Sequence, residues 1–525
     1  MKNTNNNRLI YTGVLLAATL SFEQAVQAAP LILGGDQTIS TDTSVDTVVV
    51  GNSGAGSTGG NGTLTVNNGA ALTNSGTGLI LGQIGGVNYQ SGLGYLGFNA
   101  GSTGVATITG ANSLWQNQSS ALYIGHRGQG TLNIEDGGKV FSASSYLGNN
   151  AGSTGTAIVT GTDSLWQLGA LYVGNSGQGT LIVQNGGKVS SAGHAIGTNV
   201  GSTGNVTVTG ADSLWQSSGG LSVNRGTLNI EDGGKVTNAN SGSIGSSNVA
   251  DTAATVTVIG QNSLWQNSTT LHVGNRSQGT LNVQDGGKVT NTNGYIGASN
   301  NHIGTVTVTG VNSLWQNSGF LNIGATNGGQ GTLSIDDGGV VSATNGVTIW
   351  STGSLSGNGG TLDGDVVNRG LIDPTEVFTI TGDLALTETS ILALDIFGPT
   401  VYDQLFIGGD FFIDGLLTLD FDGFTQSAFD TTYDLIHIGG DITGTWGDFD
   451  INVAGFDPAL LGYSIVGSSV DGYSRALRLT IAGTGDTGGN PDDNTVPEPA
   501  SILLIGLGGL AMLMLRRRSP RISLV

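Results

Sequence analysis

The stretch "GTLNIEDGGKV" at residues 130–140 decides the fold, because a strand pattern and a turn signal lie side by side in it. The apolar residues Leu132 and Ile134 alternate with polar ones, and this period of two is typical of a half-buried β-strand. The Asp136-Gly137-Gly138 that follows is typical of a tight turn. The stretch therefore predicts a short strand that ends in a turn.

The same stretch recurs along the chain, together with a second element, "SLWQ". The tryptophans of this element are 51, 49, 50 and 50 residues apart and define five units in residues 101–350. A coil of three short strands needs roughly 20–25 residues, so each unit should supply about two coils. The period predicts an all-β chain folded as a right-handed parallel β-helix (β-solenoid) of 18–22 coils. A series of antiparallel hairpins is the alternative topology.

The regions on either side of the five units keep the strand pattern but lose the period. Residues 29–100 contain "GTLTVNNGAAL" without a tryptophan element, and we interpret them as an N-terminal cap with a degenerate repeat. Residues 351–482 are expected to form a C-terminal β region, either irregular solenoid coils or a small separate β-domain. A Gly- and Asp-rich stretch at 483–495 is typical of a linker.

The N-terminal segment predicts export. Lys2 and Arg8 precede an apolar run, and small residues follow at a cleavage site after Ala28. This layout is typical of a secretory signal peptide, which we expect at residues 1–28. The 525 residues include no cysteine, so an exported chain of this kind has no disulfides to stabilise it.

The C-terminal segment 496–518 combines Pro497-Glu498-Pro499, an apolar run and the basic Arg516, Arg517 and Arg518. It resembles the PEP-CTERM sorting signal of Gram-negative bacteria. The resemblance implies a transmembrane helix held transiently in the inner membrane and an exosortase-type enzyme as partner. It also implies delivery to the outer surface or extracellular matrix.

The "SLW", "GTL" and "DGGKV" elements of residues 101–350 resemble the repeat of type V secretion passengers and PEP-CTERM proteins. This autotransporter-like resemblance implies a β-solenoid surface protein and names no activity. It covers about half of the chain.

The acidic residues offer one candidate for chemistry. Asp136, Asp232, Asp285 and Asp337 precede a Gly-Gly, and Asn185 takes the same place in the second unit. Asp and Asn share turn positions because both side chains bond the local backbone, whereas Asn cannot serve as a general acid. We expect turn residues and no catalytic site.

Metal and cofactor sites are also not expected. His126, His194, His272, His302 and His437 share no position in the repeat and no metal-like spacing. Calcium at Asp420 and Asp422, or at Asp492 and Asp493, is an alternative based on charge alone.

The repeat pattern leaves the orientation and role of the tryptophan side chains open. Strict alternation cannot direct both residues of "LW" inward, so the indole should face outward or sit at a coil corner. Facing outward, it would be a platform for sugar rings at about 9.6 Å intervals; otherwise it is a structural peg. We favour pegs, with glycan stacking as the alternative, at Trp115, Trp166, Trp215, Trp265 and Trp315.

Charge and composition narrow the function. A net charge of −21 with only 16 basic residues makes nucleic acid an unsuitable partner. We expect a non-enzymatic, adhesin-like protein of the cell surface or extracellular matrix, associated with exopolysaccharide in a biofilm. A polysaccharide-degrading lyase or hydrolase on the same β-helix is the alternative.

Overall fold

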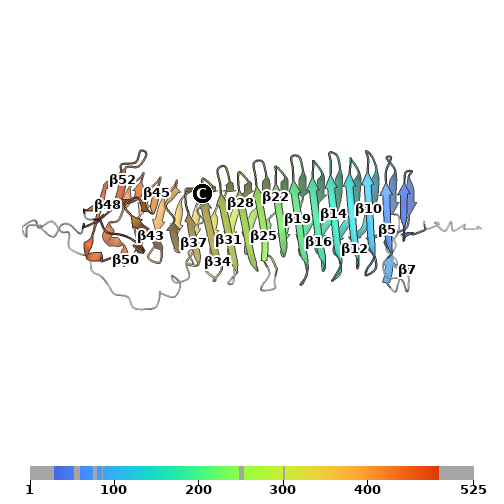
Figure 1. The fold of residues 1–525 in the computed structure, drawn as a ribbon, viewed down its shortest axis with the longest axis horizontal. Coiled ribbons are helices and arrows are strands. Elements are labelled where there is room, and N and C mark those ends of the chain that lie inside the picture. The colour runs from blue at the N-terminus through green and yellow to red at the C-terminus, as the bar shows by residue number, and fades with distance from the viewer. Residues whose placement is uncertain are drawn as a thin grey trace, which may run out of the picture.

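The computed structural model describes residues 29–51, 60–74, 80–84, 87–90, 92–247, 253–298, 302–427 and 429–483. They form an elongated stack of β-coils that runs from the N-terminal strands at one end to β52 at the other (Figure 1). The expected signal peptide with Ala28, the linker after Gly483 and the sorting segment 496–518 lie outside the described residues. Within the described part, no helix is long and apolar enough to cross a membrane.

Each coil has three strand positions, which we name the first, second and third faces. β10 (Thr103–Thr109) lies on the first face, and β11 (Leu114–Ile124) bends from the second face to the third. The next coil begins with β12 (Gln129–Glu135), which pairs with β10 in parallel and in register. Parallel pairing between coils satisfies the backbone hydrogen bonds that a single coil cannot make by itself.

The first face contains β2 (Asp36–Ile39), β5 (Asn61–Val66), β10, β12, β14 (Thr154–Thr160), β16 (Gln178–Gln184), β19 (Thr203–Thr209), β22 (Gly226–Glu231), β25 (Ala253–Ile259), β28 (Gln278–Gln284), β31 (Ile303–Thr309), β34 (Gln330–Asp336), β37 (Gly353–Gly357), β40 (Leu371–Pro374), β43 (Ile391–Gly398), β47 (Leu416–Asp420) and β50 (Asp450–Ala454).

The second face contains β3 (Thr43–Val45), β6 (Ala71–Asn74), the first halves of β11, β13 (Lys139–Leu147) and β15 (Leu165–Val173), then β17 (Lys188–Ser191), β20 (Leu214–Ser217), β23 (Lys235–Asn238), β26 (Leu264–Asn267), β29 (Lys288–Asn291), β32 (Leu314–Asn317), β35 (Val340–Ala343), β38 (Gly360–Asp363), β41 (Val377–Ile380), β45 (Gln404–Ile407) and β48 (Thr431–Ile438).

The third face contains β1 (Leu31–Leu33), β4 (Val48–Val50), β9 (Gly94–Leu96), the second halves of β11, β13 and β15, then β18 (Gly193–Ile196), β21 (Leu221–Val223), β24 (Gly242–Ile244), β27 (Thr270–Val273), β30 (Asn293–Ile296), β33 (Leu321–Ile323), β36 (Val347–Ile349), β39 (Val366–Asn368), β42 (Leu384–Leu386), β46 (Phe411–Phe412) and β49 (Ile442–Thr443). A hairpin of β7 (Ile80–Ile84) and β8 (Val87–Gln90) precedes β9.

The second face shows how the sequence repeat maps onto the coils. Trp115 pairs with Val140, and Val140 pairs with Trp166. The same alternation continues to Trp315. Each unit thus builds two coils, one with tryptophan and one with valine, as its length predicts.

The stack has fewer coils than the 18–22 expected. The sheet with one first-face strand per coil has 18 strands, and one of these, β44 (Val401–Tyr402), is an antiparallel hairpin strand rather than a coil. The prediction was too high because coils near Trp115 take 25 and 26 residues, and because the C-terminal residues form a cap instead of further coils.

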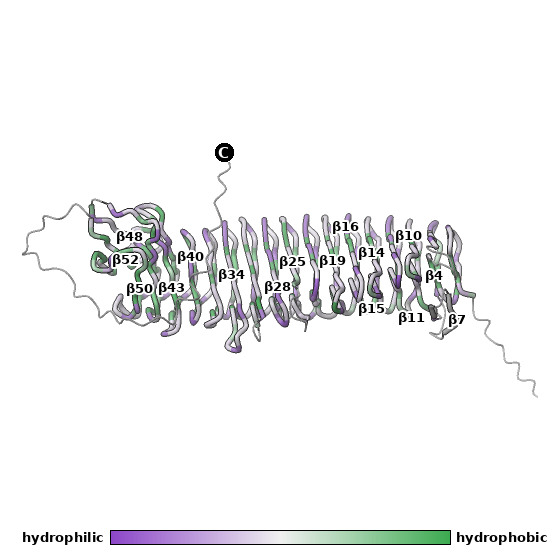
Figure 2. Tube along the Cα trace, turned by 60° about the horizontal axis from the view of Figure 1, so that its bottom comes forward, coloured by the Kyte–Doolittle hydropathy of each residue, from purple (hydrophilic) through white to green (hydrophobic). Residues whose placement is uncertain are grey.

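The main core is a continuous hydrophobic cluster from Ile39 to Ile481, and a second, small cluster contains Val49, Leu93, Tyr95 and Phe98. Strand residues alternate between buried and half-buried, so one side chain in two points into the coil. Hydrophobic and polar segments alternate along every coil in Figure 2. Each buried Leu or Ile contributes about 1.5–3 kcal/mol relative to an exposed one, and its neighbours in adjacent coils give it contacts on both sides.

The C-terminal region continues the stack and then closes it. β41 pairs in parallel with β38, and β45 pairs in parallel with β41, so residues 360–407 are further coils. β52 (Arg475–Ile481) then pairs antiparallel with β48, and β51 (Leu461–Gly467) pairs antiparallel with β52. Two short 3-10 helices, η1 (Trp446–Asp448) and η2 (Pro458–Leu460), connect these strands. We name the β48–β52–β51 group the antiparallel cap.

Candidate functional site

The acidic residues before Gly-Gly lie at the turn between the first and second faces. Asp136 has a φ of 51° and Gly137 a φ of 84°, and both values belong to the left-handed region that Asp, Asn and Gly tolerate best. Gly138 comes so close to the Ile108 carbonyl that a Cβ would collide with it. The equivalent Asn185 and the three other Asp residues share this conformation, with φ values of 50–53° at Asn185, Asp232, Asp285 and Asp337.

The serine of "SLWQ" holds this turn in place. Its hydroxyl accepts a hydrogen bond from the first glycine N–H of the turn in the preceding coil, at 3.0 Å for Gly137 and Ser164. The same bond joins four further pairs, Gly69 to Ser113, Gly186 to Ser213, Gly233 to Ser263 and Gly286 to Ser313. Sequence reasoning missed this role, although the serine recurs in every unit.

The five tryptophans lie inside the stack. Their side chains are at most 1% exposed at Trp115, Trp166, Trp215, Trp265 and Trp315. The expectation that the indole faces outward or sits at a corner was wrong. The residue before it, such as Leu114, faces outward instead and is half-buried. An indole without exposed surface cannot stack on a sugar ring.

A small residue in the preceding coil makes room for most of these indoles. A Cβ added at Gly94 would lie 3.1 Å from the ring of Trp115, and one added at Gly294 would lie 3.0 Å from that of Trp315. Packing is therefore complementary between coils: a large tryptophan on the second face lies against a small residue on the third. The Trp315 indole N–H also donates a hydrogen bond to Asn291 at 2.7 Å.

Polar side chains align from coil to coil in the interior, next to the tryptophans. They were not predicted from the sequence. Asn238 donates a hydrogen bond to Asn267 at 2.8 Å, and Asn291 donates one to Asn317 at 2.6 Å. All four are at most 5% exposed. Each buried amide needs a partner, so these bonds favour the register in which asparagines of neighbouring coils align.

The outer side of the second face carries a row in which leucine and lysine alternate, which we name the Lys–Leu row. Lys139 pairs with Leu114 on one side and Leu165 on the other. Continued coil by coil, the row contains Leu114, Lys139, Leu165, Lys188, Leu214, Lys235, Leu264, Lys288 and Leu314. All lysines of the described residues belong to this row.

These lysines are accessible and unpaired. Lys188 and Lys235 are exposed, and Lys139 and Lys288 are half-buried. Within the described residues, the ion pairs join Arg475 to Asp441 and Arg478 to Asp434, and none involves a lysine. The lysine ammonium groups are therefore available to an anionic partner.

Two shallow hollows adjoin the row, with volumes of about 390 Å³ and 410 Å³. Lys188 lines both of them, and Lys139 lines one and Lys235 the other. Asp212 belongs to the first hollow, and the turn residue Asp136 and Asp163 belong to the second. Asp163 and Asp212 lie in left-handed turns and were overlooked in the sequence, because no Gly-Gly follows them.

A line of glutamine side chains lies next to the Lys–Leu row on the same face. The residue after each tryptophan also faces outward, which places Gln167, Gln216, Gln266 and Gln316 on the surface in every second coil. Apolar, cationic and amide groups thus repeat together along one face. This combination suits a sugar polymer, which offers C–H faces, hydroxyls and in acidic forms carboxylates.

The histidines do not converge. His126 packs against Phe98 with ring centroids 5.4 Å apart, and burial lowers its pKa to about 4. Burial likewise lowers the pKa of His194 to about 4, inside the stack beside Trp215. No group of three or more potential metal ligands occurs in the described part of the chain. Of the calcium candidates, Asp420 accepts a bond from the Asp422 N–H, and Asp492 and Asp493 lie outside the described residues.

Asp403 is a buried carboxylate that sequence reasoning did not single out. It accepts hydrogen bonds from the backbone N–H groups of Glu376 (2.7 Å) and Asp395 (2.8 Å) and is 2% exposed. Burial raises the pKa of Asp403 to about 7, and the charges of Asp395 and Asp373 add to the shift. The carboxylate joins the left-handed turn at Glu376 to the hairpin that begins in β43.

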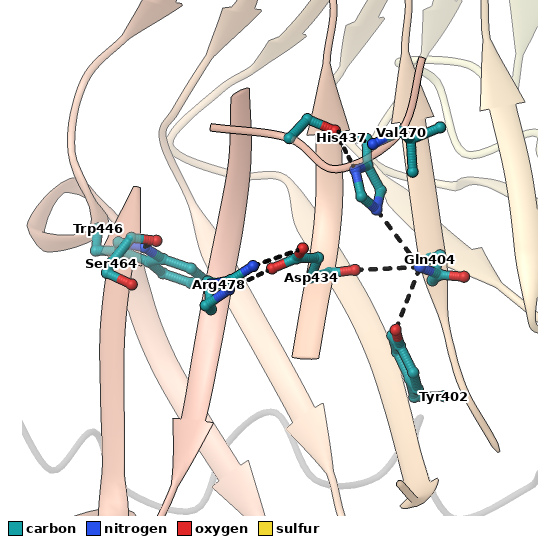
Figure 3. Close-up of polar contacts among 9 residues, drawn as sticks. Tyr402, Gln404, Asp434, His437, Trp446, Ser464, Val470 and Arg478 are labelled. Carbon is teal, nitrogen blue, oxygen red and sulfur yellow. Dashed lines mark hydrogen bonds and ion pairs between the residues drawn. The ribbon is translucent and has the colours of Figure 1, made fainter. Parts of the chain in front are cut away.

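A cluster of polar side chains joins the antiparallel cap to β44 and β45 (Figure 3). Arg478 binds Asp434 through two hydrogen bonds of 2.6 and 2.9 Å. Gln404 contacts the Tyr402 hydroxyl, the Asp434 carbonyl and the His437 ring. These contacts fasten β52 and β48 to the last regular coil, which is a structural role.

Comparison with known proteins identifies one segment. Residues 495–518 match the PEP-CTERM protein-sorting motif, and a search of the curated proteins gives no match. The motif implies export and membrane-associated sorting by an exosortase-type enzyme, as in Gram-negative bacteria. The match covers Pro497-Glu498-Pro499 and Arg516–Arg518, and does not extend to the β-stack. The type V resemblance of the repeats therefore stays a prediction.

Proposed function

We propose that this exported β-solenoid is a non-enzymatic, adhesin-like protein of the outer surface or extracellular matrix, where it binds exopolysaccharide. The main support is the outer side of the second face, where the same groups recur in every second coil from Leu114 to Leu314. A repeating surface matches a repeating polymer, since many weak contacts act together along one chain. Sorting by an exosortase would deliver the stack to a place where such polymers accumulate.

A glycan panel tests this function. The purified protein is passed over immobilised neutral and acidic polysaccharides, and both retention and released products are measured. Retention without new reducing ends supports a binder. No retention on any glycan would contradict the proposal.

A polysaccharide-degrading enzyme is the second candidate, and Asp403 favours it. A carboxyl group with a pKa of about 7 near other carboxylates has the property that a general acid needs. Against this, Asp403 is 2% exposed and both of its oxygens accept backbone hydrogen bonds. Reducing ends or unsaturated products that the wild type releases and Asp403→Asn does not would establish the enzyme.

A further inference from the structure

We propose that the Lys–Leu row binds a linear acidic polysaccharide with one carboxylate per disaccharide, aligned with the stack axis. This inference rests on the proposed function and narrows its ligand. It starts from the distribution of charge: the chain has a net charge of −21, yet the lysines of the described residues all lie in one column. An acidic polymer is repelled by most of this protein and attracted along that column.

The distance between neighbouring lysines determines which polymers can place a carboxylate at every lysine. Neighbouring coils are about 4.8 Å apart, so lysines in every second coil are about 9.6 Å apart. Two sugar residues of an extended β-linked chain span a comparable length. A carboxylate on every second sugar can therefore meet a lysine on every second coil, without bending either the polymer or the stack.

The groups between the lysines suit the sugars between the carboxylates. Half-buried leucines such as Leu165 and Leu214 offer an apolar surface to the C–H face of a sugar ring. The glutamines beside the row, such as Gln167 and Gln216, offer amide donors and acceptors to hydroxyl groups. One disaccharide would thus contact one tryptophan coil and one valine coil.

The acidic residues of the hollows restrict which polymers bind. In the tryptophan coils, Asp163 and Asp212 repel a carboxylate that is out of phase with the lysines, because no lysine of the same coil offsets them. Asp136 of the second hollow lies in the same coil as Lys139, whose charge offsets it. A polymer with a carboxylate on every sugar would place half of its charges opposite coils without lysine. The row therefore discriminates by charge spacing as well as by charge.

The length of the row sets the length of the ligand. The column holds Ala71 before Leu114 and Val340 after Leu314, so lysines occur at four positions only, from Lys139 to Lys288. Three intervals span roughly 29 Å at the strand spacing. Affinity should rise with oligosaccharide length up to about four disaccharides and then level off.

The test uses the purified full-length protein and sodium hyaluronate, which has one carboxylate per disaccharide. Dextran is the neutral control and polygalacturonate, with a carboxylate on every sugar, is the control for spacing. The double variant Lys188→Gln, Lys235→Gln removes two charges from the row. Its matched control, Arg127→Gln with Arg276→Gln, removes two charges from exposed turn positions elsewhere.

We expect the lysine double variant to bind hyaluronate at least about tenfold more weakly, and the arginine control to stay within about twofold of the wild type. The swap Lys188→Leu with Leu214→Lys keeps composition and charge but breaks the two-coil spacing, and should weaken binding as well. Circular dichroism of each variant checks that the β-stack is intact.

The outcomes separate the two proposals. Equal losses in the lysine and arginine variants, or a swap variant that binds like the wild type, would overturn the Lys–Leu row as the site. Retention on dextran that the lysine variants leave unchanged would also overturn it, while the general proposal of a polysaccharide binder would stand. Failure to retain any of the three glycans would overturn both.

Discussion

The five-unit block and the C-terminal region are parts of one stack, but they are stabilised in different ways. In the five units, similar contacts recur: a buried tryptophan, which packs against a glycine of the preceding coil at Trp115, Trp265 and Trp315, and a serine hydroxyl bonded to a turn glycine. The C-terminal region repeats one contact, in which the backbone N–H of Asp383, Asp410 or Asp441 donates to an Asp carboxylate of the preceding coil, and otherwise relies on single contacts such as Arg478 with Asp434 and the buried Asp403. Repetition distributes stability over many equivalent coils, whereas the end of the stack depends on a few specific interactions.

The two regions also differ in what their polar and charged groups contact. In the five units a uniform interior leaves the outer residues free to repeat, and the Lys–Leu row is the result. In the cap, the polar groups contact one another and close the last coil. We therefore expect ligand binding to depend on the five units and stability of the end to depend on the cap.

The largest effect should come from a tryptophan inside the five units. Trp265→Ala removes a side chain that is 0% exposed, and should lower the free energy of unfolding by about 3–5 kcal/mol, since neighbouring coils cannot fill the cavity. Denaturant unfolding measures the loss. Trp350→Ala is the matched control, because Trp350 is half-buried outside the core and contacts the Arg369 guanidinium. An equal loss in both variants would contradict the role of the inward tryptophan.

The second effect is the pH dependence that Asp403 gives to the C-terminal region. The folded pKa of Asp403 is about 7, above the ordinary 3.8, so the folded state retains a proton that the unfolded state releases. The contribution of Asp403 to stability should therefore be greatest below about pH 4 and fall as the pH rises to about 7, by at most about 1.4 kcal/mol per pH unit. Hydrogen exchange of β43 and β45 at pH 5 and pH 7 measures this.

Asp403→Asn is the variant that sharpens this test. It should remove the part of the pH dependence between pH 4 and 7 that comes from Asp403, and leave the part that comes from His437, whose pKa is lowered by burial. The substitution also costs stability because one amide nitrogen replaces an acceptor oxygen. Hydrogen exchange in β25 and β28, within the five units, should show no such dependence through Asp403. A dependence of equal size in both regions would assign it to other groups.

The smallest effect concerns the cap itself. Arg478→Ala breaks a two-bond contact with Asp434, whose side chain is only 12% exposed, and should destabilise the cap by about 1–2 kcal/mol. Arg475→Ala is the control, because its partner Asp441 is 83% exposed and such pairs contribute little. Limited proteolysis within residues 461–481 reports opening of the cap. Similar cleavage of both variants would argue against a specific role for the Arg478 pair.

The period, the strands and the turns could be predicted from local sequence patterns. Alternation at Leu132 and Ile134 and the Asp-Gly-Gly signal are local properties, and the backbone conformation that a turn demands limits it to a few residue types. The prediction of two coils per unit followed from the length of the repeat unit alone. The conformation of the turn at Asp136 and Asn185 was predictable for the same reason.

The side of the "SLWQ" strand that points inward could not be predicted in this way, because it depends on packing between coils. Leucine and tryptophan are both apolar, so a period of two assigns them to opposite sides without saying which is buried. The choice depends on contacts across coils: the indole fits against Gly94 or Gly294, and Leu114 is left outside beside Lys139. The Lys–Leu row, the interior asparagines and Asp403 arise in the same way, because residues 21 to 29 positions apart become neighbours only when the coils stack.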